Sequence, residues 1–220
     1  MTALRIATWN VHGLRAGIET VAAVVRAEAP DVLLVQESGS RRGLRAMAEA
    51  TGLTAASDPV VFPRRRVRNA VLVRPTLEVG SHRLLRLRAG SWFAPRGVLI
   101  ARLPGLTVAS VHLGLRRDER RRHAEQLLHV LPRPDQQVVV GGDLNAHPDD
   151  PATRTLASSY PDVWAAASGG RGLTMPAAAP TARIDYLFAS PRIRVRRAWL
   201  AGTPTASDHL LVVADLELSG

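Results

Sequence analysis

Short apolar runs rich in Val, Ile and Leu recur along the chain, separated by polar or Gly/Pro-rich breaks. Runs this short indicate buried β-strands, because a helix of ordinary length needs ten or more residues. We predict strands at residues 4–9, 32–36, 70–73, 98–101, 107–112, 138–141, 184–189, 194–198 and 210–218. The chain is therefore expected to fold around β-sheets.

Three segments show helical spacing instead. Ile18, Val21 and Val25 are three and four residues apart and predict a helix at residues 17–28, and similar patterns predict helices at 44–51 and 117–131. The sequence contains no internal repeat, and the Gly/Ala/Pro stretch at 165–181 predicts a surface loop. A length of 220 residues suits one domain, so we predict a single α/β domain over residues 1–220.

The charge of the chain is strongly positive. The formal net charge is +10, and all 29 basic residues are Arg. Such a charge favours polyanionic partners, possibly nucleic acid, through long-range attraction. The absence of Lys, together with abundant Ala, also fits a coding bias that places Arg on the surface without selecting a partner, and both interpretations stay open.

Composition also limits the cellular location and the metal chemistry. No apolar run approaches the roughly 20 residues that cross a bilayer, and the N-terminal residues lack the apolar segment of a signal peptide. We expect a cytoplasmic monomer without integral membrane association. Because the chain has no Cys, any metal must be held by oxygen or imidazole ligands.

Polar residues suited to catalysis lie at the ends of the predicted strands, where side chains from distant parts of the chain can converge. Hydrolysis of a phosphate ester needs a hard cation, a group that directs water, donors to the phosphate and assistance to the leaving group. Glu37 and Asp208 are suitable oxygen ligands for Mg²⁺, or for Mn²⁺ as a substitute. Asp143 and Asn145, two residues apart, can orient water and donate to the phosphate. The candidate motifs are TWN at Asn10, QE at Glu37, SVHL at His112, GGDLN at Asp143 and Asn145, RIDY at Asp185, and SDH at Asp208 and His209.

Each motif also has a purely structural explanation. Short polar residues after a strand often make turns, His112 could be a structural histidine, and Asp185 could pair with the neighbouring Arg183 at the surface. Taken singly, each motif favours that explanation. The complete set in this order favours a catalytic site instead.

The ordered motifs resemble those of the endonuclease/exonuclease/phosphatase superfamily over nearly the whole chain. The resemblance implies a four-layer sandwich of two packed mixed β-sheets flanked by helices, with the site at one end. It also implies metal binding by Glu37, with Asn10 and Asp208 on metal or phosphate.

The same resemblance implies roles for the other motif residues. Asp143 and Asn145 correspond to a water-orienting pair, and His209 to a histidine that contacts the phosphate and is oriented by Asp185. His112 corresponds to a second histidine that assists the leaving group. Asn69 and Arg96 are weaker candidates for substrate binding.

These observations predict a Mg²⁺-dependent hydrolase of phosphate esters that uses a metal-positioned water, foremost a phosphodiesterase or nuclease. A lipid or small-molecule phosphodiesterase or phosphatase is the main alternative, since one scaffold can serve many substrates. A non-catalytic nucleic-acid-binding module is a third, which the intact set of candidate residues disfavours.

Overall fold

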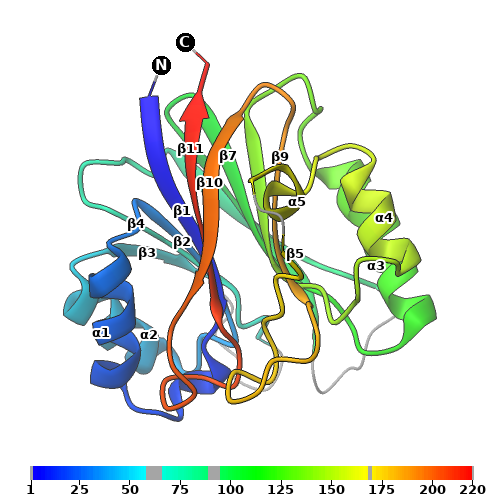
Figure 1. The fold of residues 1–220 in the computed structure, drawn as a ribbon. Coiled ribbons are helices and arrows are strands. Elements are labelled where there is room, and N and C mark those ends of the chain that lie inside the picture. Colours follow the sequence, from blue (N-terminus) through cyan, green and yellow to red (C-terminus); the bar gives the residue numbers. More distant parts are fainter. Residues whose placement is uncertain (1, 58–65, 89–94, 168–169, 220) are drawn as a thin grey trace.

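The computed structural model describes residues 2–57, 66–88, 95–167 and 170–219. Two mixed β-sheets pack face to face (Figure 1). Sheet A has the strand order β10-β11-β1-β2-β4-β3, and sheet B the order β5-β6-β7-β8-β9. The strands of sheet A are β1 (Thr2–Asn10), β2 (Val32–Gln36), β3 (Thr54–Ser57), β4 (Ala70–Val73), β10 (Arg194–Ala201) and β11 (Leu211–Leu218). Those of sheet B are β5 (Ser81–Arg86), β6 (Gly97–Leu103), β7 (Leu106–His112), β8 (Val138–Asp143) and β9 (Asp185–Ala189).

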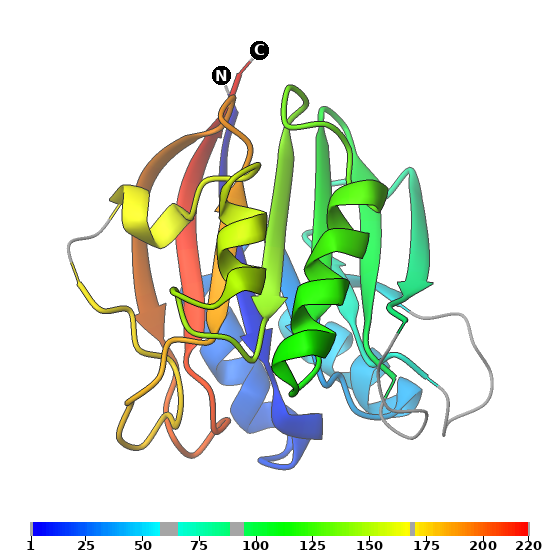
Figure 2. The same ribbon diagram turned by 90° about the vertical axis from the view of Figure 1, so that its right-hand side faces the viewer.

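Helices cover the outer face of each sheet. Helices α1 (Ile18–Glu28) and α2 (Arg41–Thr51) lie against sheet A. Helices α3 (Arg117–Val130) and α4 (Pro151–Ala157) lie side by side against sheet B (Figure 2). A short helix α5 (Val163–Ala167) and a 3-10 turn at His12–Leu14 complete the helical elements of the described residues. The fold is thus the four-layer α/β sandwich that the motif resemblance implied.

Three apolar layers hold this sandwich together, and strand alternation explains them. On β1, Leu4 and Ile6 point toward the opposite sheet, whereas Ala7 and Trp9 point toward the helices. Every central strand repeats this division, because successive side chains of a strand point to opposite faces. The predicted continuous apolar runs are therefore strands buried on both faces.

The structure adds elements that the sequence prediction missed. The predicted strands and helices are all present, some with shifted ends; the helix predicted at 44–51 begins at Arg41. Strands β3 and β5 and helices α4 and α5 were not predicted. The segment predicted as a loop at 165–181 includes the end of α5, and its described remainder carries one isolated bridge, between Met175 and Ala182. Among the described helices, none combines the length and apolar character needed to cross a bilayer.

Candidate active site

The candidate site continues the inner face of the two sheets. Along β7, the residues that face the opposite sheet run from Leu106 and Val108 to Ser110 and then His112, so the core changes from apolar to polar toward one end. Strand β1 shows the same progression, and β8 passes from Val139 through Gly141 to Asp143. Side chains that alternate along neighbouring strands therefore meet at one end of the sandwich.

A buried polar layer separates the apolar core from the site. The Gln36 amide donates to the hydroxyl of Ser110 on the opposite sheet (3.1 Å) and to that of Thr8 on its own sheet (3.2 Å). The Ser110 hydroxyl in turn donates to the Val35 carbonyl (2.8 Å). Gly141 lets the sheets approach here, because a Cβ atom would lie 2.7 Å from a side-chain atom of Leu34. These contacts fix the register of sheet A against sheet B directly beneath the site.

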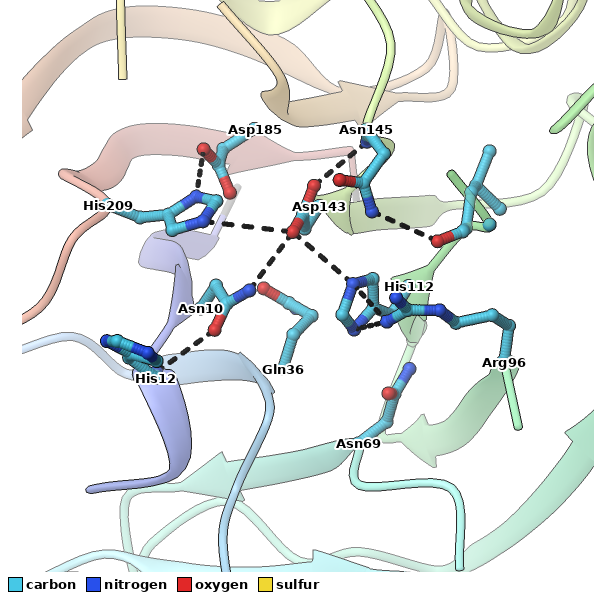
Figure 3. A network of polar contacts seen from close by, with 12 residues as sticks. Asn10, His12, Gln36, Asn69, Arg96, His112, Asp143, Asn145, Asp185 and His209 are labelled. Carbon is cyan, nitrogen blue, oxygen red and sulfur yellow. Dashed lines mark hydrogen bonds and ion pairs between the residues drawn. The ribbon is translucent and has the colours of Figure 1, made fainter. Parts of the chain in front are cut away.

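Asp143 is the centre of the site and is almost completely buried (Figure 3). Its Oδ2 accepts a hydrogen bond from Asn10 Nδ2 (3.0 Å), and its Oδ1 accepts from the Asn145 backbone N–H (2.8 Å). His112 Nε2 lies 3.3 Å from the same Oδ2. Burial raises the pKa of Asp143, against the influence of His112 and the Asn10 hydrogen bond. Asp143 thus joins residues from both sheets.

His112 is held as a neutral imidazole. Burial, together with the charge of Arg96, lowers its pKa to about 3, although the charge of Asp143 acts in the opposite direction. The Arg96 Nη1 atom lies 2.8 Å from His112 Nδ1 and 2.5 Å from His112 Nε2. Because a guanidinium can only donate, this contact also requires a ring nitrogen with a free lone pair. His112 can therefore donate a hydrogen bond while uncharged.

His209 has the opposite charge state. Burial alone would lower its pKa, but its hydrogen bond to Asp185 and the charges of Asp185, Asp143 and Asp208 outweigh burial and raise the pKa to about 9. His209 Nδ1 lies 2.9 Å from Asp185 Oδ2, so the predicted pairing of these residues is present. The alternative partner, Arg183, pairs with Asp162 instead. His209 Nε2 remains available on the side of Asp143, whose Oδ2 lies 4.0 Å away.

A more open rim borders this buried cluster. The side chain of Asp208 is 39% exposed, and that of His12 is 34% exposed, with 3.4 Å between His12 Nδ1 and Asp208 Oδ1. Gln36 occupies the inward position at the end of β2. Glu37 follows it with a positive φ of 50°. Among the described residues, no hydrogen bond or ion pair engages the Glu37 carboxylate. The rim thus offers two carboxylates to solvent.

The residues present fit a hard divalent cation. Asp143, Asp185 and His209 bring ligand atoms within 4.8 Å of one another; because the charged His209 ring has no free lone pair, the two carboxylates are the donors of this cluster, and the buried Asp185 Oδ1 lacks a hydrogen-bond partner among the described residues. Beside this cluster, the Asn10 amide oxygen and the rim carboxylates supply further oxygen donors. Oxygen-rich, open donor sets suit Mg²⁺ and Mn²⁺. The cluster with the closest ligand atoms differs from the set predicted for the metal, namely Glu37, Asn10 and Asp208.

The structure brings most of the predicted residues together, and it gives Asn69 a structural contact. The Asn69 side chain is buried, and its amide nitrogen donates to the backbone carbonyls of Gly97 (3.0 Å) and Ser110 (2.7 Å). Both amide hydrogens therefore serve the connection between the sheets, and substrate binding by Asn69 stays a prediction. Sequence reasoning did not identify His12, Gln36 or Ser110, although His12 and Ser110 lie two residues from Asn10 and His112, and Gln36 is next to Glu37.

Comparisons with known proteins agree with the fold and the motifs. The chain is similar to an endonuclease/exonuclease/phosphatase from Bacteroides vulgatus (TM-score 0.82, 19% identity, 100% of both chains). It is also similar to the human Nocturnin catalytic domain with bound sulfate anion (TM-score 0.76, 19% identity, 99% of this chain and 95% of that one). A third similar structure is a mannosyl-6-phosphatase from Bacteroides thetaiotaomicron (TM-score 0.78, 17% identity, 98% of this chain and 100% of that one). A comparison with functionally curated proteins gave no significant match.

The match to a family model covers the whole set of motifs. Residues 7–209 match the model of the Endonuclease/Exonuclease/phosphatase family, whose members are phosphoesterase hydrolases. The match begins just before Asn10 and ends at His209. The chain belongs to the Endonuclease/Exonuclease/phosphatase family.

Proposed function

We propose that the protein is a Mg²⁺-dependent phosphoesterase, foremost a phosphodiesterase or nuclease, that hydrolyses its substrate with a positioned water molecule. The observation that carries this proposal is the contrast between a neutral His112 and a charged His209 on either side of Asp143. One site then contains a carboxylate that can direct water and donors in two charge states, which suits hydrolysis of a phosphate ester.

The charged His209 is the proposed donor to a phosphate oxygen. Its Nδ1 is engaged by Asp185, which fixes the orientation of the ring and leaves Nε2–H to donate. Asp143 accepts hydrogen bonds on both oxygens, so its carboxylate is held in place to direct a water molecule. Asn145, whose amide nitrogen donates to the Leu113 carbonyl (3.1 Å), supports that segment.

His112 is proposed to assist the leaving group by hydrogen bonding. A histidine with a pKa near 3 is uncharged at neutral pH and is a poor source of a full proton. Arg96 lies against His112 and adds positive charge on the same side. Together they would stabilise charge that develops on the leaving oxygen.

The rim residues are the proposed metal ligands. Glu37, Asp208 and the Asn10 amide oxygen would hold the cation. When bound, it would neutralise phosphate oxygens and lower the pKa of a bound water molecule. The formal net charge of +10 would help to collect a polyanionic substrate.

A substrate panel tests this proposal. Purified protein should hydrolyse bis-p-nitrophenyl phosphate, single-stranded DNA or RNA in Mg²⁺, and EDTA should stop the reaction. The panel includes p-nitrophenyl phosphate and sugar phosphates, because one similar structure is a mannosyl-6-phosphatase. Asp143→Asn serves as the inactive control. Salt-dependent DNA binding without turnover of any phosphoester in Mg²⁺ or Mn²⁺ would instead identify a binding module.

A further inference from the structure

A hollow of about 510 Å³ lies at the end of sheet B that is opposite the candidate active site. It is formed by the start of β5, the end of β6 and the segment after α3. The register pairs Ser81 with Arg102 at this end of β6, whereas Gly97 at the other end pairs with His112. Five residues of strand place the hollow roughly 15 Å or more from the site.

The charged groups that line this hollow all carry or can carry positive charge. They are His82, Arg83, Arg102 and Arg133, and no carboxylate is among the described residues that line the hollow. Within the described residues, none of these three guanidinium groups forms an ion pair, although eight arginines elsewhere do. A second hollow, beside α2, contains Arg41 and Arg45 but also Glu49. The hollow at the end of sheet B therefore concentrates positive charge, and the carboxylate of Glu78 lies in the lining of an adjoining hollow that shares Ser81 and Arg102.

The positions of two of these arginines are fixed by the sheet. Arg83 pairs with Ile100, and Arg102 pairs with Ser81, so Arg83 and Arg102 stand on one face at diagonal positions. Cβ atoms in this arrangement are about 7 to 8 Å apart. Arg83 Nη2 also donates to the Val130 carbonyl at the end of α3 (3.0 Å). Arg83 and Arg102 thus lie at neighbouring positions on one face of the sheet, and the lining of the hollow also includes the buried Ile100 and Leu131.

We propose that this hollow is a second anion site, which binds a ligand with at least two neighbouring phosphate groups. Guanidinium groups match phosphate oxygens in geometry, and two neighbouring ones that form no ion pair with the described residues favour a ligand whose charges are also adjacent. The volume lies within the usual range of small-molecule sites, roughly 300 to 1,000 Å³. A free oligophosphate and a short segment of single-stranded nucleic acid share this chemistry. The proposal does not depend on the roles assigned in the active site.

Binding to metal-free protein tests the second site. The background is His209→Ala, which removes the proposed phosphate contact of the active site. Isothermal titration calorimetry with tripolyphosphate compares this protein with one that also carries Arg83→Gln and Arg102→Gln. The control carries Arg154→Gln and Arg194→Gln, two exposed arginines outside the hollow, and loses the same charge. We expect at least tenfold weaker binding after the first pair of substitutions and less than twofold after the control pair.

A second titration, with a hexathymidylate, identifies the source of the phosphates. Loss of affinity for both ligands assigns the hollow to nucleic-acid strands as well, whereas loss for tripolyphosphate alone assigns it to free oligophosphates. Equal weakening by the two pairs, or no tripolyphosphate binding before substitution, would overturn the proposal. With His209 intact, the Arg83→Gln/Arg102→Gln protein should keep its melting temperature and its turnover of bis-p-nitrophenyl phosphate. Because turnover of bis-p-nitrophenyl phosphate measures the active site and calorimetry measures the hollow, the two readouts distinguish a failure of this proposal from a failure of the proposed function.

Discussion

The candidate active site has a buried half and an open half. In the buried half, the side chains of His112, Asp143, Asp185 and His209 are at most 6% exposed, and each contacts another member. In the open half, Asp208 and His12 are more than 30% exposed, and the Glu37 side chain lies beyond the end of β2 in a partly exposed position. Protein contacts fix the first set, whereas the second leaves carboxylates directed to solvent.

This difference indicates a division of labour. Groups that must act on reacting atoms gain from fixed orientation and shifted pKa values, and both follow from burial beside charged neighbours. Groups that hold a hard cation must exchange water and admit substrate, so an open position suits them. Substitutions in the buried half should therefore affect the reaction itself, and those in the open half should affect the metal requirement.

The largest expected loss of activity follows substitution of His209 or Asp185. His209→Ala should lower kcat by about 10³ to 10⁴, and Asp185→Asn by at least about 10², the range of acid–base assistance. Because the two act as a unit, the double variant should be scarcely slower than His209→Ala. A double-mutant cycle on steady-state rates measures this. Losses that multiply would show that the hydrogen bond between them does not serve the reaction.

Glu37→Gln should cause a smaller loss that depends on the metal. We expect at least about a 10²-fold loss of turnover at limiting Mg²⁺, partly restored at high Mg²⁺, because an amide replaces an anionic ligand. Mn²⁺ binding followed by electron paramagnetic resonance should weaken in parallel. Glu49→Gln, an exposed carboxylate on α2, is the matched control and should change neither quantity. Near-normal activity of Glu37→Gln at limiting Mg²⁺ would remove Glu37 from the metal site.

The pH dependence of stability should separate the two histidines of the buried half. The folded metal-free protein keeps His112 neutral down to about pH 3, so below pH 6.5 only the unfolded chain gains that proton and stability falls. His209 stays charged up to about pH 9. Its contribution to the unfolding free energy is therefore complete below pH 6.5 and is lost as pH rises through 9. Each histidine should change the unfolding free energy by at most about 1.4 kcal/mol per pH unit.

Urea unfolding between pH 4 and 10 measures these slopes. His112→Ala should flatten the acid side, and His209→Ala the alkaline side. Identical pH profiles for both variants and the wild-type protein would contradict the assigned charge states.

Much of this arrangement was predictable from the sequence, and the exceptions have physical causes. Central strands are apolar on both faces and therefore easy to find, whereas β5 carries Arg83 and Arg86 on an exposed edge and was missed. Helix α4 was missed although Asp150 followed by Pro151 is a recognisable helix start. The pairing of Asp185 with His209 could be predicted, since it follows from one motif resemblance.

Other features depend on spatial neighbours that sequence does not reveal. The neutral state of His112 results from burial and from Arg96, which directly precedes a different strand, β6. The role of Asn69 depends on the carbonyls of Gly97 and Ser110, far away in sequence. The direction of Glu37 is set by a positive φ that ends the strand alternation. These are properties of the packed sheets.

The smallest expected effect on the rate concerns the polar layer beneath both halves. Gln36→Leu leaves the hydroxyls of Thr8 and Ser110 without their amide partner in a fully buried place, which should cost about 1 to 3 kcal/mol of unfolding free energy. Turnover should fall only a few-fold, because Gln36 touches neither the proposed metal site nor the reacting atoms.

If the polar layer sets the register between the buried and the open half of the site, Gln36→Leu should raise the Mg²⁺ concentration needed for half-maximal rate more than it lowers kcat, since Glu37 is adjacent. Thr107→Val, which removes a half-buried hydroxyl elsewhere on the strand of Ser110, controls for loss of a polar group alone. Urea unfolding and Mg²⁺ titrations of the rate measure both quantities, and an unchanged Mg²⁺ requirement alongside lost stability would confine Gln36 to a role in packing.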